Sequence, residues 1–109
     1  MIRVFSGAAP SSSPGNPKGS WMMRKRDFEK YKSAAGGNSR KLAKLIANKL
    51  ALERVPTHFV QIKVPPGTKI NISFANAQTW GGGRTGGGIQ VQVVGRVRDS
   101  WLVSNPKEL

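Results

Sequence analysis

The chain has 109 residues, of which 18 are Lys or Arg and 5 are Asp or Glu, so its formal charge at pH 7 is +13. It contains one His and no Cys, which excludes a disulfide framework, a thiolate metal site and a Cys nucleophile. The few, scattered carboxylates argue against a two-metal nuclease and a glycosidase, because both need converging carboxylates. We therefore expect neither a bound metal nor another cofactor.

The net positive charge predicts an anionic partner, most often a nucleic acid. Solubility alone is served by mixed signs and a modest net charge, and an acidic protein partner is compatible with RNA binding. No apolar run approaches the roughly 18 residues that a membrane span requires. The N-terminal MIRVFSGAAP lacks the layout of a secretory signal, so we expect no membrane partner and one domain over residues 1–109.

The N-terminal half is predicted to combine a short strand with two helices. Residues 2–5 form the strand, and residues 6–20 form a flexible loop rich in Ser, Pro and Gly. Asp27 is a candidate N-cap for the first helix, which ends at residues 35–37.

A second helix is expected from Asn38 or Ser39 to about Arg54. Four apolar residues recur at the spacing of one buried helical stripe, and they are Leu42, Leu45, Ile46 and Leu50.

The C-terminal half changes to the alternating pattern of strands. Residues 57–64, 69–74 and 89–98 alternate, residues 65–68 are predicted to turn a hairpin, and residues 101–103 are a candidate last strand. The predicted fold class is α+β. The N-terminal strand and the two helices are expected to pack on one face of a three- to five-stranded antiparallel sheet.

The alternation divides the side chains of this sheet between two faces. Ile70, Ile72 and Phe74 are expected on an apolar face that the helices cover. The opposite face is either an ordinary solvated face or, as we prefer given the charge, a surface for an RNA backbone. The candidate RNA-binding residues on it are Lys63, Lys69, Gln92, Arg96 and Arg98.

Residues 81–88 (GGGRTGGG) place two triple glycines around an Arg-Thr pair. Glycine lets a backbone approach a phosphate closely, and the guanidinium fork of Arg84 suits phosphate. The segment lacks the Gly-Lys-Ser/Thr ending of a nucleotide-binding P-loop. Trp80, just before it, either stacks on a base or fills the end of the core.

His58 is the one side chain whose unperturbed pKa lies near neutrality. It is a candidate acid or base, with a place at the edge of the core as the equally weighted alternative. RNA carries its own nucleophile, the 2′-OH, so cleavage needs only an acid, a base and cations on the phosphate. DNA lacks that nucleophile and is not an expected partner. The candidate catalytic residues are His58, Arg84, Thr85 and Gln90.

Residues 64–70 (VPPGTKI), followed by Trp80-Gly81 and Gly86-Gly87-Gly88-Ile89-Gln90, resemble the C-terminal toxin domains of bacterial polymorphic toxins. These domains belong to contact-dependent inhibition and Rhs-type effectors. The resemblance implies an antibacterial domain that is delivered into the cytoplasm of a target cell. It also implies an acidic cognate immunity protein that neutralises the domain.

Two groups of such toxins share this pattern. The small barnase-, colicin- and RelE-like ribonucleases imply a metal-independent ribonuclease, with tRNA as the expected target, and this is our first hypothesis. The ADP-ribosyltransferase-like group, which includes NAD-glycohydrolase toxins, has an early Arg and a Gln after the glycine run; Arg3 and Gln90 match these positions, although Gln90-Val91-Gln92 stands in place of a terminal acidic motif. The third hypothesis is an RNA-binding protein without catalytic activity.

Overall fold

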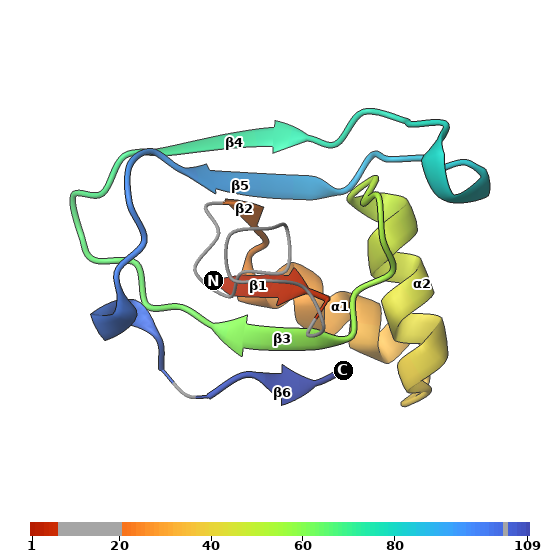
Figure 1. Cartoon of the computed structure of the whole chain (residues 1–109), viewed down its shortest axis with the longest axis horizontal. Coiled ribbons are helices and arrows are strands. Elements are labelled where there is room, and N and C mark those ends of the chain that lie inside the picture. The colour runs from red at the N-terminus through yellow and green to blue at the C-terminus, as the bar shows by residue number, and fades with distance from the viewer. Residues whose placement is uncertain (7–20, 104) are drawn as a thin grey trace.

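The computed structural model describes residues 1–6, 21–103 and 105–109 (Figure 1). The described elements are β1 (Ile2–Phe5), β2 (Trp21–Met22), α1 (Lys25–Ala34), α2 (Ser39–Lys49), β3 (His58–Gln61), β4 (Ile70–Phe74), η1 (Trp80–Gly82), β5 (Ile89–Val93), η2 (Asp99–Trp101) and β6 (Lys107–Glu108). The predicted α+β class is confirmed. The predicted loop over residues 6–20 lies, except for Ser6, outside the described residues.

The strands form two antiparallel three-stranded sheets, with the orders β1–β3–β6 and β2–β5–β4. The predicted turn at residues 65–68 forms, because the amide and hydroxyl of Thr68 donate to the Pro65 carbonyl at 3.3 and 2.7 Å. The strands that it joins, β3 and β4, belong to different sheets, so the predicted hairpin is wrong. Both edges of β3 are already occupied by β1 and β6.

Two clusters of buried side chains make up the core. The first joins the helices to β1, and includes Ile2, Val4, Phe28 and Ile46. The second joins the two sheets through residues that include Phe5, Val60, Ile62, Val91 and Val93. Strand β1 is therefore buried on both faces, with Ile2 and Val4 in the first cluster and Phe5 in the second.

The helix boundaries differ from the predicted ones in two places. The N-cap of α1 is Arg24, and Asp27 lies in the first turn, where its carboxylate accepts from the Arg24 Nε at 2.7 Å. Asn38 caps α2 as predicted, because its Oδ1 accepts from the Lys41 amide at 3.0 Å. Helix α2 ends at Lys49, well before Arg54.

The early end of α2 has a local cause. The Leu52 amide donates to the Ala47 carbonyl, the Ala51 amide donates to the Asn48 carbonyl, and Ala51 has a φ of 51°. These features make up a Schellman motif, which closes a helix with one residue in the left-handed region. Glycine usually occupies that position, so an alanine there gives no sequence signal for the helix end.

Strand β4 departs most from the sequence analysis. All five of its residues are exposed, including Ile72 at 57% and Phe74 at 69%, so they are not on the covered face that we predicted. Their neighbours Val91 and Val93 on β5 are buried as predicted. The other sheet reaches β5 but does not extend over β4, which is the edge strand (Figure 1).

The last predicted strands are also corrected. Strand β5 stops at Val93, and Gly95, with a φ of 104°, lies in a bend, so Arg96 and Arg98 do not lie on a sheet face. Residues 101–103 form no strand; Leu102 makes only an isolated bridge to Ile62. The short strand β6 was not predicted.

The exposed edge predicts a sharp difference between two residues that face each other across the sheet. Ile72 lies opposite Val91, which is fully buried. We expect Val91→Ala to lower the free energy of unfolding by about 2 kcal/mol, because it leaves a cavity in the core. We expect Ile72→Ala to change it by about 0.5 kcal/mol or less. Urea denaturation measures both, and equal losses would show that β4 is covered in solution.

Candidate functional site

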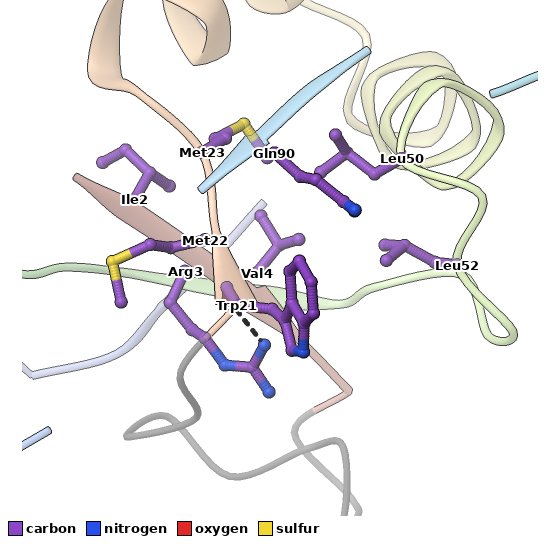
Figure 2. A pocket seen from close by; sticks show the side chains of 9 residues that line it. All are labelled: Ile2, Arg3, Val4, Trp21, Met22, Met23, Leu50, Leu52 and Gln90. Atoms are coloured by element: carbon purple, nitrogen blue, oxygen red, sulfur yellow. Dashed lines mark hydrogen bonds between the residues drawn. The ribbon is translucent and has the colours of Figure 1, made fainter. Parts of the chain in front are cut away.

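A cleft lies where β1, β2 and the start of β5 meet the end of α2 (Figure 2). Its volume is about 40 Å³. Most of its wall is apolar, and the polar side chains that line it are Arg3 and Gln90. The full set of lining residues is Ile2, Arg3, Val4, Trp21, Met22, Met23, Leu50, Leu52 and Gln90.

Arg3 is a fixed cation in the wall of this cleft. Only 9% of its surface is exposed, and its Nη1 donates to the Trp21 carbonyl at 2.8 Å. Burial lowers the pKa of the guanidinium, but an arginine starts so far above neutrality that it keeps its charge. The neighbouring β1 residues are apolar and buried, so the arginine is held in place by the packing of the strand.

Gln90 and Trp21 complete the accessible part of the wall. Gln90 is the second residue of β5 and is half-buried; its Nε2 lies 3.4 Å from the Ser73 hydroxyl on β4. Trp21 opens β2 and remains 44% exposed, although the next two residues are buried. In Figure 2 its indole ring and the Gln90 amide both lie toward the cleft. The cleft thus combines one cation, one amide and one accessible aromatic ring.

The glycine-rich segment 81–88 docks on the end of α2. The amides of Gly86 and Gly88 donate to the carbonyls of Asn48 and Lys49, both at 2.9 Å. The Thr85 amide donates to the Asn48 Oδ1 at 2.7 Å. The Gly86 and Gly88 amides thus bond to carbonyls of the last helical turn, which have no partner inside the helix, and the Thr85 amide bonds to a side chain of that turn. The backbone amides of Thr85, Gly86 and Gly88 therefore bond to α2 and do not point toward a phosphate site.

Two side chains next to these glycines bind the residues that follow α2. Arg84 donates from Nε to the Leu52 carbonyl at 2.9 Å, and Trp80 donates from Nε1 to the Ala51 carbonyl at 3.0 Å. A cation at a helix C-terminus is also favoured by the helix dipole. Arg84 and Trp80 were candidates for phosphate and base contacts, and the structure gives both of them a role in holding the segment to the helix.

His58 belongs to the other sheet. It is half-buried at the start of β3, its Nδ1 lies 2.7 Å from the Thr57 hydroxyl, and its ring stacks on Phe5 with 5.9 Å between centroids. Across the sheet it lies opposite Glu108. It does not line the cleft that contains Gln90. The structure therefore does not bring the four candidate catalytic residues into one site.

The candidate RNA-binding cations gather at the opposite end of the strands. Lys63 follows β3, Lys69 precedes β4, and Arg96 and Arg98 follow β5; all four are exposed. The Lys63 amide bonds to the Trp101 carbonyl and the Val94 amide to the Lys69 carbonyl, so these segments lie together (Figure 1). Gln92 is half-buried within β5, opposite Trp21 and Asn71. We call Lys63, Lys69, Arg96 and Arg98 the basic end.

The sequence analysis did not assign Trp21, Leu50 and Leu52 to a site. Trp21 is exposed, whereas the two methionines that follow it are buried. Nothing in the residue types of this segment distinguishes the exposed tryptophan from the buried methionines. Leu50 and Leu52 reach the cleft because α2 ends early, which the sequence did not indicate. Arg3 had been linked to Gln90 only through the resemblance to ADP-ribosyltransferase-like toxins.

Comparisons with models of known protein families, with curated proteins and with solved structures find no match to this chain. Within the described residues, no group of three or more His, Asp or Glu residues could hold a metal ion. Among the same residues, no helix is long and apolar enough to cross a membrane.

The docking of the glycine-rich segment predicts that Arg84 contributes to stability. We expect Arg84→Ala to lower the free energy of unfolding by about 2 kcal/mol, because it leaves the Leu52 carbonyl without this donor. Thr85→Ala is the matched control, since the backbone amide of Thr85 makes the bond to Asn48 and its side chain is exposed. Urea denaturation measures both variants. If Arg84→Ala leaves the free energy of unfolding unchanged, Arg84 is not needed for stability and is again a candidate for phosphate binding.

Proposed function

We propose that this chain is an NAD-consuming toxin domain that hydrolyses the bond between nicotinamide and ribose or transfers the ADP-ribosyl group. The observation that carries the proposal is that Arg3 and Gln90, which lie far apart in the sequence, line one cleft. They are the two positions that match the ADP-ribosyltransferase-like pattern. The residues of the ribonuclease hypothesis lie in separate places, which reverses the order of preference reached from the sequence.

The chemistry of this reaction suits a chain with few carboxylates. The nicotinamide nitrogen is positively charged in NAD, so the leaving group takes the electron pair of the broken C1′–N bond without needing a proton donor. The sugar carbon then resembles an oxocarbenium ion, as in glycoside hydrolysis, and water adds to it and loses a proton. The protein must mainly bind the dinucleotide, orient it and position the water.

Each polar group of the cleft has a role in this proposal. The guanidinium of Arg3 faces the pyrophosphate, the amide of Gln90 orients the ribose hydroxyls or the attacking water, and Trp21 offers a surface for ring stacking. The cleft volume of about 40 Å³ is well below that of most small-molecule sites, roughly 300–1,000 Å³, so most of the dinucleotide would lie outside it, along the surface beside Trp21 and Gln90.

The proposal predicts that Gln90 is essential and Gln92 is not. We expect Gln90→Ala to lower the rate of NAD loss by about 100-fold or more, because the amide that positions the reacting groups is gone. Gln92→Ala removes the same amide two residues along the same strand, outside the cleft, and should retain nearly full activity. Chromatography of nicotinamide and ADP-ribose measures the rates. Equal activity in the two variants, or no NAD loss with the unaltered chain, would contradict the proposal.

RNA cleavage is the second candidate, and the charge distribution favours it. The charge of +13 exceeds what NAD binding needs, and the exposed basic end suits an RNA backbone. His58 is half-buried beside the Thr57 hydroxyl, a position from which an imidazole can exchange protons. In this reading the toxin cleaves RNA, with tRNA as the expected target, through attack of the 2′-OH.

The two candidates make opposite predictions for His58. Incubation of the chain with total bacterial RNA in EDTA, beside a parallel NAD assay, separates them. If the second candidate is correct, the unaltered chain yields discrete RNA fragments, His58→Ala abolishes them and Arg3→Gln retains cleavage. If the first is correct, RNA stays intact, NAD is consumed, Arg3→Gln removes that activity and His58→Ala retains it. Binding of RNA with neither reaction would support the RNA-binding hypothesis instead.

Both candidates place the chain in the class of delivered antibacterial toxins. The proposed partner in the producing cell is an acidic immunity protein. Opposite charges would give such a pair a fast association rate that falls with ionic strength.

A further inference from the structure

The outer edge of β4 is an unpartnered strand edge. β4 ends the sheet β2–β5–β4, and within residues 1–6, 21–103 and 105–109 no strand pairs with its other side (Figure 1). All five of its residues are exposed. An exposed strand edge offers a row of backbone donors and acceptors to another chain, and natural proteins usually protect such edges.

The register shows which backbone groups of β4 face outward. The Val94 amide bonds to the Lys69 carbonyl, and the Ala75 amide bonds to the Gly88 carbonyl. In an antiparallel pair, alternate residues direct their backbone groups to the partner strand and those between them direct theirs away. Residues 69, 71, 73 and 75 therefore bond to the β5 side. Ile70, Ile72 and Phe74 direct their N–H and C=O groups to the open edge.

The same three residues also carry the exposed apolar side chains. They lie opposite Val93, Val91 and Ile89, so they extend the apolar face of the sheet beyond the part that is covered. A strand that paired with the outer edge of β4 would bond to these residues through the backbone. It would also cover their side chains with its own apolar residues, at every second position.

Charge determines what kind of strand fits here. No acidic residue occurs between Glu53 and Asp99, so β4 and β5 are uncharged and every charged residue in the segments around them is positive. Lys69 directly precedes β4, and Arg96 lies just beyond the end of β5. A second copy of this chain would bring another +13 to the same place, and RNA has no backbone that completes a β-ladder or covers isoleucines.

We propose that the outer edge of β4 is the docking surface for an acidic protein partner, which adds a strand that alternates apolar and acidic or polar residues. The partner strand bonds to Ile70, Ile72 and Phe74, and its carboxylates face Lys69 and the other cations of the basic end. None of the residues that line the cleft lies on β4, and the proposal does not depend on which reaction the cleft supports.

A random linear peptide library displayed on phage tests the proposal with the full chain as bait. We expect the enriched peptides to alternate apolar residues with Asp or Glu. Their affinity should fall at least about tenfold in Ile72→Pro, which removes an outward N–H without removing a bond to β5. Ile72→Asp should give a similar loss. Asn71→Ala is the control, because it truncates an exposed side chain on the opposite face of β4 and adds no charge beside the partner's carboxylates, so it should retain binding.

Two further measurements test whether the variants remain folded and whether the peptide binds at β4. Circular dichroism and thermal unfolding should show that the Ile72 variants remain folded. Bound peptide should slow hydrogen exchange of the amides of Ile70, Ile72 and Phe74 in the unaltered chain. Enriched peptides that lack acidic residues, or that bind the Ile72 variants unchanged, would overturn the proposal. So would self-association of the chain through β4 in sedimentation, or displacement of β4-bound peptide by a short RNA.

Discussion

The hydrogen bonds between the glycine-rich segment and the end of α2 set the geometry of the candidate site. Gly86 and Gly88 reach the last carbonyls of the helix through their amides. A Cβ at residue 88 would lie 2.8 Å from both the Lys49 carbonyl oxygen and the Tyr31 hydroxyl, and one at residue 86 would lie 2.5 Å from the Ala75 carbonyl oxygen. Only glycine allows these approaches, so Gly88 is explained by packing against the helices and Gly86 by packing against residues 75–77, and neither by a ligand.

This contact determines what surrounds the cleft. Residues 86–88 lead directly into β5, so the position of the helix end fixes where Gln90 begins its strand. The same helix end places Leu50 and Leu52 in the cleft wall, and hydrogen bonds from Arg84 and Trp80 connect the two segments. Arg3 lies on β1, which is held in place because both core clusters contain β1 residues. The polar groups of the cleft therefore sit on rigid elements, as a binding site requires.

The sequence predicted features that local patterns determine. The N-cap at Asn38, the buried stripe with Ile46, and the alternation of Val91 and Val93 on β5 all follow from periodicity or capping chemistry. The sequence-based prediction failed where contacts between distant segments determine the structure. Alternation showed that Ile72 and Phe74 share a face with Val91, but it could not show that the other sheet stops short of β4. The end of α2 was missed because Ala51 occupies a position where glycine is the usual signal.

The candidate site was predicted in part for the same reason. Residue types suggested that Arg84 and Trp80 bind a ligand, since an arginine among glycines suits phosphate and a tryptophan suits a base. Arg84 bonds to the Leu52 carbonyl and Trp80 to the Ala51 carbonyl, just after the end of α2 and 32 and 29 residues earlier in the chain. Residue types alone cannot show that a side chain bonds to a backbone carbonyl so far away in the sequence. Arg3 and Gln90 converge through the antiparallel packing of β1, β2 and β5, which only the fold provides.

The cleft and the basic end carry only part of the positive charge of the chain, and these two parts have different consequences. The cleft contains a single cation, Arg3, which is buried and therefore only weakly screened by salt. The basic end is exposed, so its interactions with any anionic partner should weaken as ionic strength rises. The net charge of +13 is thus not a property of the cleft, and it cannot by itself identify what the cleft binds. A salt dependence confined to partner association, with little effect on chemistry in the cleft, is what this arrangement of charges implies.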